Sequence, residues 1–390
     1  MKALVVSRSL PRYAAAKVAG AFAPALSARV GPLGLSEIDE PALPGADWKR
    51  VYPALAGICG SDLATVEGRS SRYFEPIVSF PFVPGHEVVG HLDDGRRVVV
   101  EPVLGCAARG ITPPCQACAD CRTDRCERVA FGHLQPGLQT GYCADTGGGW
   151  STALVAHDSQ IHIVPDDMSD EAAVMVEPAA CATHGAMAAA PGGGTVFVVG
   201  GGTLGLCTVA ALRRFTTPAT LIVAAKHPEQ RRLARELGAD IVVAPGEARR
   251  AVRRATGSLE VGDSLSSGAD LVIDCVGSQS SIADDLLLTR SGGTVVLVGM
   301  PGHVLVDLTP LWHRQINLRG SYAYGLENEP AGSRRTFDLA FDLVAHSGLE
   351  RLVSAAYPLD RYRDAIDHAA NAGPRGAVKV VFDVRGEKHR

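Results

Sequence analysis

The stretch Thr195-Val-Phe-Val-Val-Gly-Gly-Gly-Thr-Leu-Gly205 decides how the second half of the chain folds. Its first five residues form a short β-branched and apolar run, which predicts a strand buried on both faces. Gly200-x-Gly-x-x-Gly205 follows, and Leu206–Leu212 then continues with apolar residues at helical spacing. The context of strand, glycine turn and helix is what gives this glycine pattern its meaning.

Each glycine in that turn has a physical role. Gly200 permits a tight turn, Gly202 lets the backbone approach a pyrophosphate, and Gly205 lets the helix pack on the strand. The N-terminus of the helix then presents unpaired N–H groups to the anion. We therefore expect dinucleotide binding here, with Thr203 and Leu204 as further contacts. The alternative is a glycine turn without a ligand.

From residue 195 onward, runs typical of strands and helices alternate. Alternating units of this length predict a parallel sheet with helices on both faces, which is the doubly wound (Rossmann) α/β fold. After the glycine turn, the alternating elements are Thr220–Ala224, Pro228–Leu237, Ile241–Ala244, Asp270–Asp274, Ile282–Thr289, Thr294–Gly299 and Ile316–Ser321.

The length, net charge and hydropathy of the chain limit the functions that it can have. With 390 residues, the chain is long enough for two domains. A net charge of -4 gives no electrostatic basis for binding nucleic acid or an anionic membrane. No apolar run approaches the ~20 residues of a membrane span, and the N-terminus resembles a first strand rather than a signal peptide. A cytoplasmic location is expected. Residues 10–35, rich in Ala, Pro and Gly, suggest an irregular excursion between the first strands.

Candidate metal ligands gather in the first half. Cys59 lies in Ala56-Gly-Ile-Cys-Gly-Ser-Asp62, and His86 and Glu87 lie in Pro84-Gly-His-Glu-Val. A thiolate, an imidazole and a carboxylate form the mixed ligand set that Zn²⁺ prefers. Taken singly, each is more typical of a core or hydrogen-bonded residue.

Ten cysteines in a chain of this size without an export signal favour metal binding over disulfides. Four of them follow the pattern Cys115-x2-Cys118-x2-Cys121-x4-Cys126. Four thiolates this close can close a tetrahedral site with no open position, which makes the zinc structural rather than catalytic. The alternative is a set of reduced surface cysteines without metal.

These motifs, in this order, resemble the zinc-dependent medium-chain alcohol and polyol dehydrogenases, from about residue 50 to 382. The resemblance implies a β-rich GroES-like catalytic domain at 1–178 and 325–390, with a structural-zinc lobe at about 106–128. It implies a Rossmann domain at 179–324. The family's lobe usually has seven residues in its last gap, so Cys126 is in question as the fourth ligand and Cys106 is a possible substitute.

The resemblance also implies roles at the catalytic metal. Glu177, in Val176-Glu-Pro178, matches the carboxylate that the polyol and threonine dehydrogenase-like branch carries there, so we expect it as the third ligand beside Cys59 and His86. A helix-terminal acid is its alternative interpretation. Ser61 matches the hydroxyl that relays the proton, and Asp62 is expected to orient a ligand. Glu87 is expected to support the metal site or to exchange as a ligand. Relatives often carry a histidine where Ala64 stands, which leaves the route of the proton to solvent open.

Cofactor choice is predicted from the end of the second strand of the dinucleotide domain. NAD enzymes usually carry an acidic residue there, but this chain has Ala225 followed by Lys226, with Arg231 nearby. Without that carboxylate, and with cations close by, a 2′-phosphate is not repelled and can be paired, so we expect NADP over NAD. By resemblance, Cys275, Val276 and Gly299 line the cofactor.

The expected function is therefore zinc-dependent hydride transfer between a secondary alcohol or polyol and NAD(P), by a homodimer or homotetramer acting on a small molecule. One alternative is a zinc-free NADPH-dependent quinone or alkene reductase of the same superfamily, which metal analysis would distinguish. Another is a non-catalytic, zinc-stabilised interaction module, which failure to bind a nicotinamide would favour.

Overall fold

The computed structural model describes residues 1–22, 24–189, 192–329 and 332–387. The chain divides into two compact units, Met1–Glu177 with Gly348–Arg390, and Pro178–Ser347. The first boundary falls beside the expected residue 178, whereas the second falls after Ser347 rather than before residue 325. The second boundary differs because helix α12 (Thr336–Ser347) packs against α7 (Thr203–Phe215) inside the second unit. Asp342 on α12 forms an ion pair with Arg214 on α7 at 2.9 Å.

The second unit contains a six-stranded sheet in the order β10-β9-β8-β13-β14-β15, and every neighbouring pair is parallel. Its strands are β8 (Thr195–Val199), β9 (Thr220–Ala224), β10 (Ile241–Val243), β13 (Ala269–Asp274), β14 (Thr289–Leu297) and β15 (Asn317–Gly320). The chain runs outward from β8 to one edge and then returns to β13 and the other edge. The direction of winding therefore reverses beside β8, which is where open α/β sheets bind ligands.

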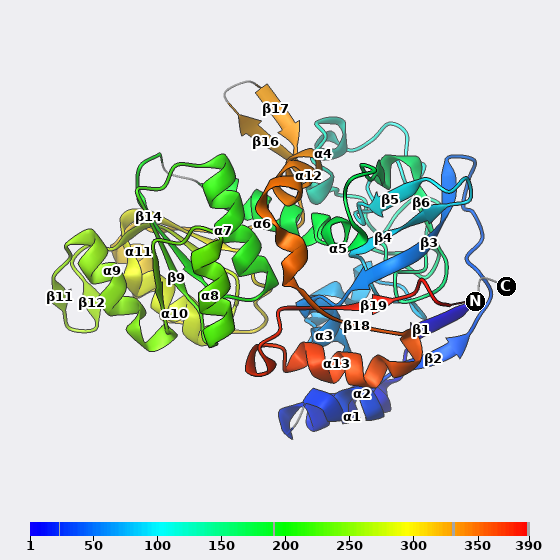
Figure 1. The fold of residues 1–390 in the computed structure, drawn as a ribbon, viewed down its shortest axis with the longest axis horizontal. Helices are drawn as coiled ribbons and strands as arrows, with labels where there is room; N and C mark the ends of the chain where they lie inside the picture. The colour runs from blue at the N-terminus through cyan, green and yellow to red at the C-terminus, as the bar shows by residue number, and fades with distance from the viewer. Residues whose placement is uncertain (23, 190–191, 330–331, 388–390) are drawn as a thin grey trace. The chain divides into compact units, whose positions relative to one another are not determined.

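Helices pack against this sheet, as Figure 1 shows for α7, α8 and α10. The helices and short hairpins of the unit are α6 (Val176–Met187, which begins in the first unit), α7, α8 (Pro228–Glu236), α9 (Ala248–Thr256), α10 (Gln279–Leu288), α11 (Thr309–His313), α12, β11–β12 (Glu260–Val261, Ser264–Leu265) and β16–β17 (Leu326–Glu329, Gly332–Arg335). The predicted Rossmann fold is confirmed, because continuous apolar runs such as β8 are buried on both faces.

The first unit contains a seven-stranded, largely antiparallel sheet in the order β18-β19-β3-β4-β5-β7, with β6 paired to β3. Its strands are β3 (Trp48–Gly57), β4 (Val88–Leu92), β5 (Arg97–Val100), β6 (Leu154–His157), β7 (Ile161–Ile163), β18 (Val353–Tyr357) and β19 (Lys379–Asp383), and β1 (Lys2–Val6) pairs separately with β2 (Leu33–Glu37). Its helices are α1 (Leu10–Phe22), α2 (Pro24–Val30), α3 (Gly60–Val66), α4 (Gln116–Ala119), α5 (Asp170–Ala173) and α13 (Tyr362–Ala370).

The segment between β1 and β2 differs from its prediction. An irregular excursion was expected over residues 10–35, but α1 and α2 form there, and α2 lies beside α13 (Figure 1). Alanine has the highest helix propensity of all residues, and the alanine-rich run at 14–16 outweighs the unfavourable Gly20. None of the helices in the described ranges combines the length and the hydropathy that crossing a bilayer requires.

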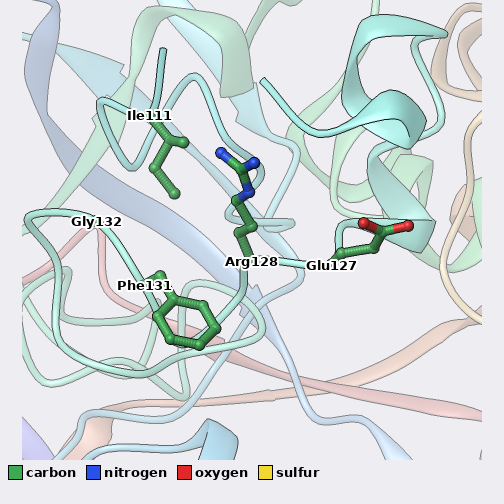
Figure 2. Close-up of a pocket in the computed structure, with 5 residues that line it drawn as sticks. All are labelled: Ile111, Glu127, Arg128, Phe131 and Gly132. Carbon is green, nitrogen blue, oxygen red and sulfur yellow. The ribbon is translucent and has the colours of Figure 1, made fainter. Parts of the chain in front are cut away.

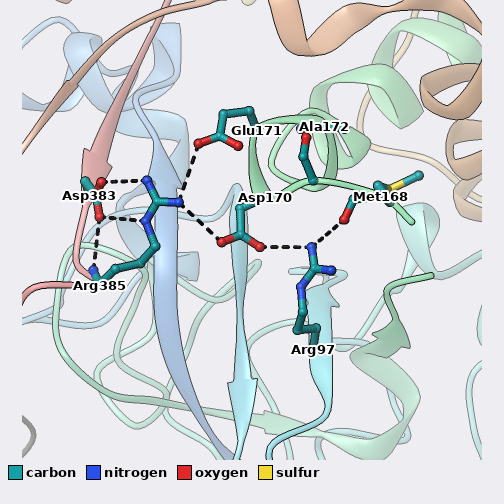
Figure 3. A network of polar contacts seen from close by, with 8 residues as sticks. Arg97, Met168, Asp170, Glu171, Ala172, Asp383 and Arg385 are labelled. Carbon is teal, nitrogen blue, oxygen red and sulfur yellow. Dashed lines mark hydrogen bonds and ion pairs between the residues drawn. The ribbon is translucent and has the colours of Figure 1, made fainter. Parts of the chain in front are cut away.

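A polar network joins the end of the C-terminal strand β19 to helix α5 and strand β5. The Arg97 guanidinium on β5 donates to an Asp170 carboxylate oxygen at 2.9 Å, and Arg385, just after β19, lies 3.5 Å from the other oxygen (Figure 3). Asp383 binds the same Arg385 at 2.7 Å. Asp170 thus contacts two arginines from distant parts of the chain, one of which directly follows β19, the strand that carries Lys379.

Candidate active site and metal centres

Four cysteines of the lobe converge. The sulfur atoms of Cys106, Cys115, Cys118 and Cys126 all lie within 4.8 Å of one another. Backbone N–H groups point at these sulfurs, with Cys115 N 3.4 Å from Cys106 Sγ and Arg128 N 3.5 Å from Cys126 Sγ. Burial opposes ionisation of Cys115, but backbone hydrogen bonds and the neighbouring thiols lower its pKa to about 7. A set of four thiols fits a closed tetrahedral zinc site.

The ligand set differs from the predicted one at one position. Cys121 was expected to be a ligand, but it lies outside the cluster, and Cys106 occupies the fourth place. Cys121 is exposed and has a φ of 56°, so the chain reverses there after α4. Cys118 and Cys126 are then separated by seven residues, which is the last gap that the family usually shows. Cys115, Cys118 and Cys126 therefore match the last three cysteines of the family pattern, and Cys106 supplies the remaining thiol.

A buried arginine organises the loops around this cluster. Arg109 is fully buried and donates to five backbone carbonyl oxygens, two of which are Leu104 O at 3.1 Å and Phe131 O at 2.9 Å. Burial lowers the pKa of its guanidinium, and the neighbouring thiols and Asp145 oppose that effect. Arg109 thereby satisfies carbonyl groups that the irregular loop leaves without secondary-structure partners.

A hollow of about 510 Å³ lies on the outside of the lobe, lined by Ile111, Glu127, Arg128, Phe131 and Gly132 (Figure 2). Phe131 is 65% exposed there. None of the candidate catalytic residues lines this hollow, so we do not assign it as the active site.

Three adjacent strands explain how the catalytic candidates meet. β3 is antiparallel to both β4 and β19, and Ala56 pairs with Val88 while Gly57 pairs with Val381. The end of β3 therefore lies beside the starts of β4 and β19. This register brings Cys59, which follows β3, together with His86 and Glu87, which precede β4.

Cys59 and His86 share one buried environment, in which the Cys59 thiol and Asp62 both act on the His86 ring. The Asp62 carboxylate accepts the Cys59 N–H at 2.9 Å, and its other oxygen lies 3.5 Å from His86 Nδ1. Burial would lower the pKa of His86, but Asp62 and Cys59 together raise it well above its ordinary value. Because Asp62 faces Nδ1, the Nε2 atom is left as the available metal ligand.

Lys379, on β19, is a member of the site that the sequence analysis did not identify. Its ammonium forms an ion pair with Glu87, and both side chains are 1% exposed. Burial would lower the pKa of Lys379, but Glu87 and Cys59 raise it above its ordinary value. Gly57 is required beside this pair, because any side chain there would collide with Glu87 and Lys379. A lysine within the otherwise apolar run at 377–382 was the available clue.

Glu177 lies in the first turn of α6 and is buried, and its charge acts on Lys379 as those of Glu87 and Cys59 do. Among the described residues, only the lobe cysteines bring three or more ligand atoms within 4.8 Å of one another, so Cys59, His86 and Glu177 do not form so tight a set. The donor chemistry of thiolate, imidazole and carboxylate nevertheless fits zinc.

Ser61 is partly buried in α3. Tyr142 was not predicted as a site residue. Its hydroxyl donates to Asp62 Oδ1 at 3.4 Å, and burial together with the Asp62 charge raises its pKa. Ala64 is 4% exposed and offers no donor where relatives often carry a histidine.

In the second unit, the glycine turn has the geometry expected of a phosphate cradle. Gly200 has a φ of 103°, and a side chain at Gly205 would collide with the Gly200 carbonyl. Gly202 caps α7, where an added Cβ would meet nothing within 4 Å. The space above Gly202 is thus open at the N-terminus of a 13-residue helix that begins with Thr203 and Leu204.

The ends of β13 and β14 pack against this turn. Val276 approaches Gly200 so closely that a Cβ there would lie 2.9 Å from Val276 Cγ2, and Gly299 has no room for a side chain beside Val276. Val276 is 49% exposed. The sulfur of Cys275, the residue before Val276, lies 3.5 Å from Thr208 Oγ1. Burial raises the pKa of this thiol to about 12, so Cys275 is a packing residue rather than a reactive thiol.

The loop after β9 carries cations and no free carboxylate. Arg231 donates to the carbonyl oxygens of Ala225 at 3.0 Å and Lys226 at 2.8 Å, while Lys226 is exposed. The nearest acid, Glu229, is bound to Arg232 at 2.5 Å. His227 lies in the same loop, and burial together with the charges of Lys226 and Arg231 lowers its pKa.

Known proteins match both units. The profile of the alcohol dehydrogenase GroES-like domain matches residues 45–166, and that of the zinc-binding dehydrogenases matches residues 202–345. The L-galactonate-5-dehydrogenase of Escherichia coli is 30% identical over 285 residues, which cover 70% of this chain and 75% of that protein. The sorbitol dehydrogenase of Arabidopsis thaliana is 28% identical over 360 residues, covering 86% and 88%. A Sinorhizobium meliloti structure bound to NADP is 26% identical, with a TM-score of 0.68 and coverage of 90% and 95%.

A glycine turn on a parallel sheet and a four-thiol cluster in a β-rich unit define a zinc-dependent nicotinamide oxidoreductase. The chain belongs to the zinc-dependent medium-chain dehydrogenase family. It transfers a hydride between an alcohol, or the corresponding carbonyl compound, and a nicotinamide cofactor.

Proposed function

We propose that the chain interconverts a secondary hydroxyl of a polyol or sugar acid and the corresponding ketone. Relatives named for sorbitol and L-galactonate support this substrate class. The observation that carries the proposal is the register of β3 with β4 and β19, which brings Cys59, His86, Glu87 and Lys379 together. In this proposal the first unit holds both metals and the second holds the dinucleotide.

Cys59, His86 and Glu177 would hold the catalytic zinc, which when bound supplies a Lewis acid that polarises the alcohol oxygen and lowers its pKa. Asp62 contacts two of these ligands, because its carboxylate accepts the Cys59 N–H and lies 3.5 Å from His86 Nδ1. The Lys379 ammonium forms an ion pair with Glu87, so this fourth potential zinc ligand is already paired. The nicotinamide cofactor, held at the glycine turn Gly200–Gly205, would supply the acceptor for the hydride of the carbinol carbon, and Ser61 would take up the hydroxyl proton, so that each alcohol yields one ketone, one NAD(P)H and one proton.

Zinc quantification together with an alcohol and polyol panel, run with NADP⁺ and NAD⁺, tests this function. We expect two zinc ions per chain and turnover of secondary polyols. Cys59→Ser should retain one zinc, lose turnover and keep cofactor binding. Cys207→Ser, a buried cysteine in α7 outside the metal clusters, is the matched control and should retain two zinc ions. Full activity of Cys59→Ser with one zinc would contradict the proposal.

We further propose that the cofactor is NADP. The electropositive loop at Ala225–Arg231 supports this, because Lys226 is exposed and the acid at Glu229 is already paired. Lys226→Asp should shift the ratio of kcat/KM values toward NAD by about 100-fold, because a charge-assisted hydrogen bond of ~1.5–3 kcal/mol is lost and replaced by repulsion. Arg232→Ala, at a paired and exposed arginine, should change that ratio less than about twofold. A wild-type preference for NAD would refute the assignment.

We propose that the chain forms a homodimer, by way of β15. This strand is an edge of the six-stranded sheet, and all four of its residues are exposed. An open edge presents unpaired backbone groups to another strand. Leu318 on β15 and Trp312 in the preceding helix add apolar surface, with exposures of 40% and 80%. Light scattering should give twice the chain mass, and a monomer at micromolar concentration would refute the dimer.

A further inference from the structure

A buried histidine–glutamate pair in the second unit joins a helix to a hairpin. His184 Nδ1, on α6, lies 2.5 Å from Glu327 Oε1, on β16, and the two residues are only 5% and 6% exposed. Because a carboxylate only accepts hydrogen bonds, the Nδ1 atom carries the hydrogen of this contact. The same Oε1 atom accepts the hydroxyl of Thr336, the first residue of α12, at 2.8 Å. The Glu327 carboxylate thus binds α6 and α12 at once.

The helix residue next to this pair packs on the carboxyl edge of the parallel sheet. A Cβ added at Gly185 would lie 2.5 Å from Val298 Cγ2 and 3.6 Å from Ser321 Oγ. Val298 and Ser321 directly follow β14 and β15. Gly185 therefore lets α6 approach this edge closely, but it has no side chain that could hold the helix there. The neighbouring His184 supplies that attachment.

The segment between β15 and β16 depends on the same pair. The Ser321 N–H donates to Leu297 O at 2.9 Å, which fixes the start of the segment to the sheet. Ala323 then has a φ of 52°, a left-handed conformation that residues with a side chain seldom adopt unless the surrounding structure holds them in it. At the far end, the Glu327 carboxylate anchors the segment to the two helices. Both ends of the segment at 321–327 are therefore fixed, and His184 provides one of the contacts at its far end.

We propose that the His184–Glu327 pair positions the nicotinamide half of the cofactor. A dinucleotide crosses the carboxyl edge of a doubly wound sheet where the winding reverses, which is beside β8 in this chain. Its adenosine half lies toward the end of β9, so its nicotinamide half lies toward the ends of β13, β14 and β15. The helix α6 and the segment at 321–327 border that side of the edge, and the pair holds them together. The inference goes beyond the proposed substrate and rests only on the nicotinamide cofactor.

The test compares binding of the whole cofactor with binding of its adenosine half. The zinc-loaded protein is titrated with NADPH and NADH, and with ADP-ribose and its 2′-phosphate as probes that lack nicotinamide. His184→Leu and Glu327→Met remove the contact, whereas Glu327→Gln keeps an acceptor oxygen in the same place. Asp342→Leu is the matched control, because Asp342 also joins α12 to a neighbouring helix, through Arg214 on α7 at 2.9 Å. The urea midpoint of every variant is measured beside its Kd values.

We expect His184→Leu and Glu327→Met to raise the Kd for the preferred cofactor at least about tenfold, because losing a charge-assisted hydrogen bond leaves α6 and the segment at 321–327 less firmly held. The Kd for the corresponding adenosine probe should stay within about twofold of wild type, and Asp342→Leu should change neither Kd by more than that. Glu327→Gln should raise the cofactor Kd by only about threefold, since its amide oxygen still accepts the hydrogen bond.

Two results would overturn the proposal. If the Kd rose equally for the cofactor and for its adenosine probe, the pair would support the whole unit rather than the nicotinamide. If the cofactor Kd stayed within about twofold of wild type in both His184→Leu and Glu327→Met, the pair would position nothing that the nicotinamide contacts. Should those two variants fail to fold, the same comparison of ligands on Glu327→Gln decides, and a loss confined to the cofactor supports the assignment.

Discussion

Replacing Cys106 with serine is expected to abolish the structural zinc, whereas replacing Cys121 is expected to leave it in place. The reason is the cluster itself, in which Cys106 lies within 4.8 Å of three other sulfurs while Cys121 is exposed and outside it. A closed structural site contributes directly to folding, so its loss should lower the free energy of unfolding by more than about 4 kcal/mol.

Metal analysis and denaturant unfolding measure this pair of variants. Cys106→Ser should fall from two zinc ions per chain to one, and the irregular lobe should become susceptible to limited proteolysis. Cys121→Ser is the matched control, because it removes a thiol from the same loop, and its unfolding midpoint should stay close to wild type. If Cys121→Ser lost a zinc ion while Cys106→Ser kept both, the assigned ligand set would be refuted.

The sequence predicted the Rossmann unit well because its pattern is local. Buried parallel strands are continuous apolar runs, so β8 and β9 were predicted with their observed bounds, and α8 begins at Pro228 as predicted. The unit boundary after Ser347 was not predicted, because it depends on α12 packing on α7.

The cysteine lobe shows what spacing alone cannot resolve. With five cysteines within 21 positions, the run from Cys115 to Cys126 can be aligned in two registers. Only the reversal of the chain at Cys121, with its positive φ, shows which cysteine is excluded. Cys106 is nine residues before Cys115 and joins the cluster through loop geometry that Arg109 stabilises.

Tyr142 and Lys379 could not be assigned from sequence because their roles depend on distant contacts. Tyr142 is 80 residues from Asp62, and Lys379 is 292 residues from Glu87. Neither belongs to a short motif, and each reaches the site only through sheet register or loop packing. Cys59, His86 and Glu177 were predicted as metal ligands from their residue types and from the family resemblance, and that role stays a prediction.

Replacing Lys379 with methionine is expected to destabilise the first unit by about 3–5 kcal/mol, because it leaves the Glu87 carboxylate buried without its partner. Both side chains are 1% exposed, so water cannot take the place of the ammonium. Denaturant unfolding of the holoenzyme measures the loss. The double variant Lys379→Met/Glu87→Gln removes both charges and should recover most of the lost stability, because the penalty belongs to the unpaired charge.

A surface pair provides the contrast for this experiment. Lys2 and Glu387 form an ion pair at 2.8 Å, but their side chains are 28% and 18% exposed, so Lys2→Met should cost no more than about 1 kcal/mol. If Lys379→Met cost as little as Lys2→Met, Glu87 would have another partner or would be protonated in the folded protein. If the double variant were no more stable than Lys379→Met, the loss would come from packing around β19 rather than from charge. Recovery in the double variant would instead establish that Lys379 is retained in an apolar strand to neutralise the buried Glu87 carboxylate.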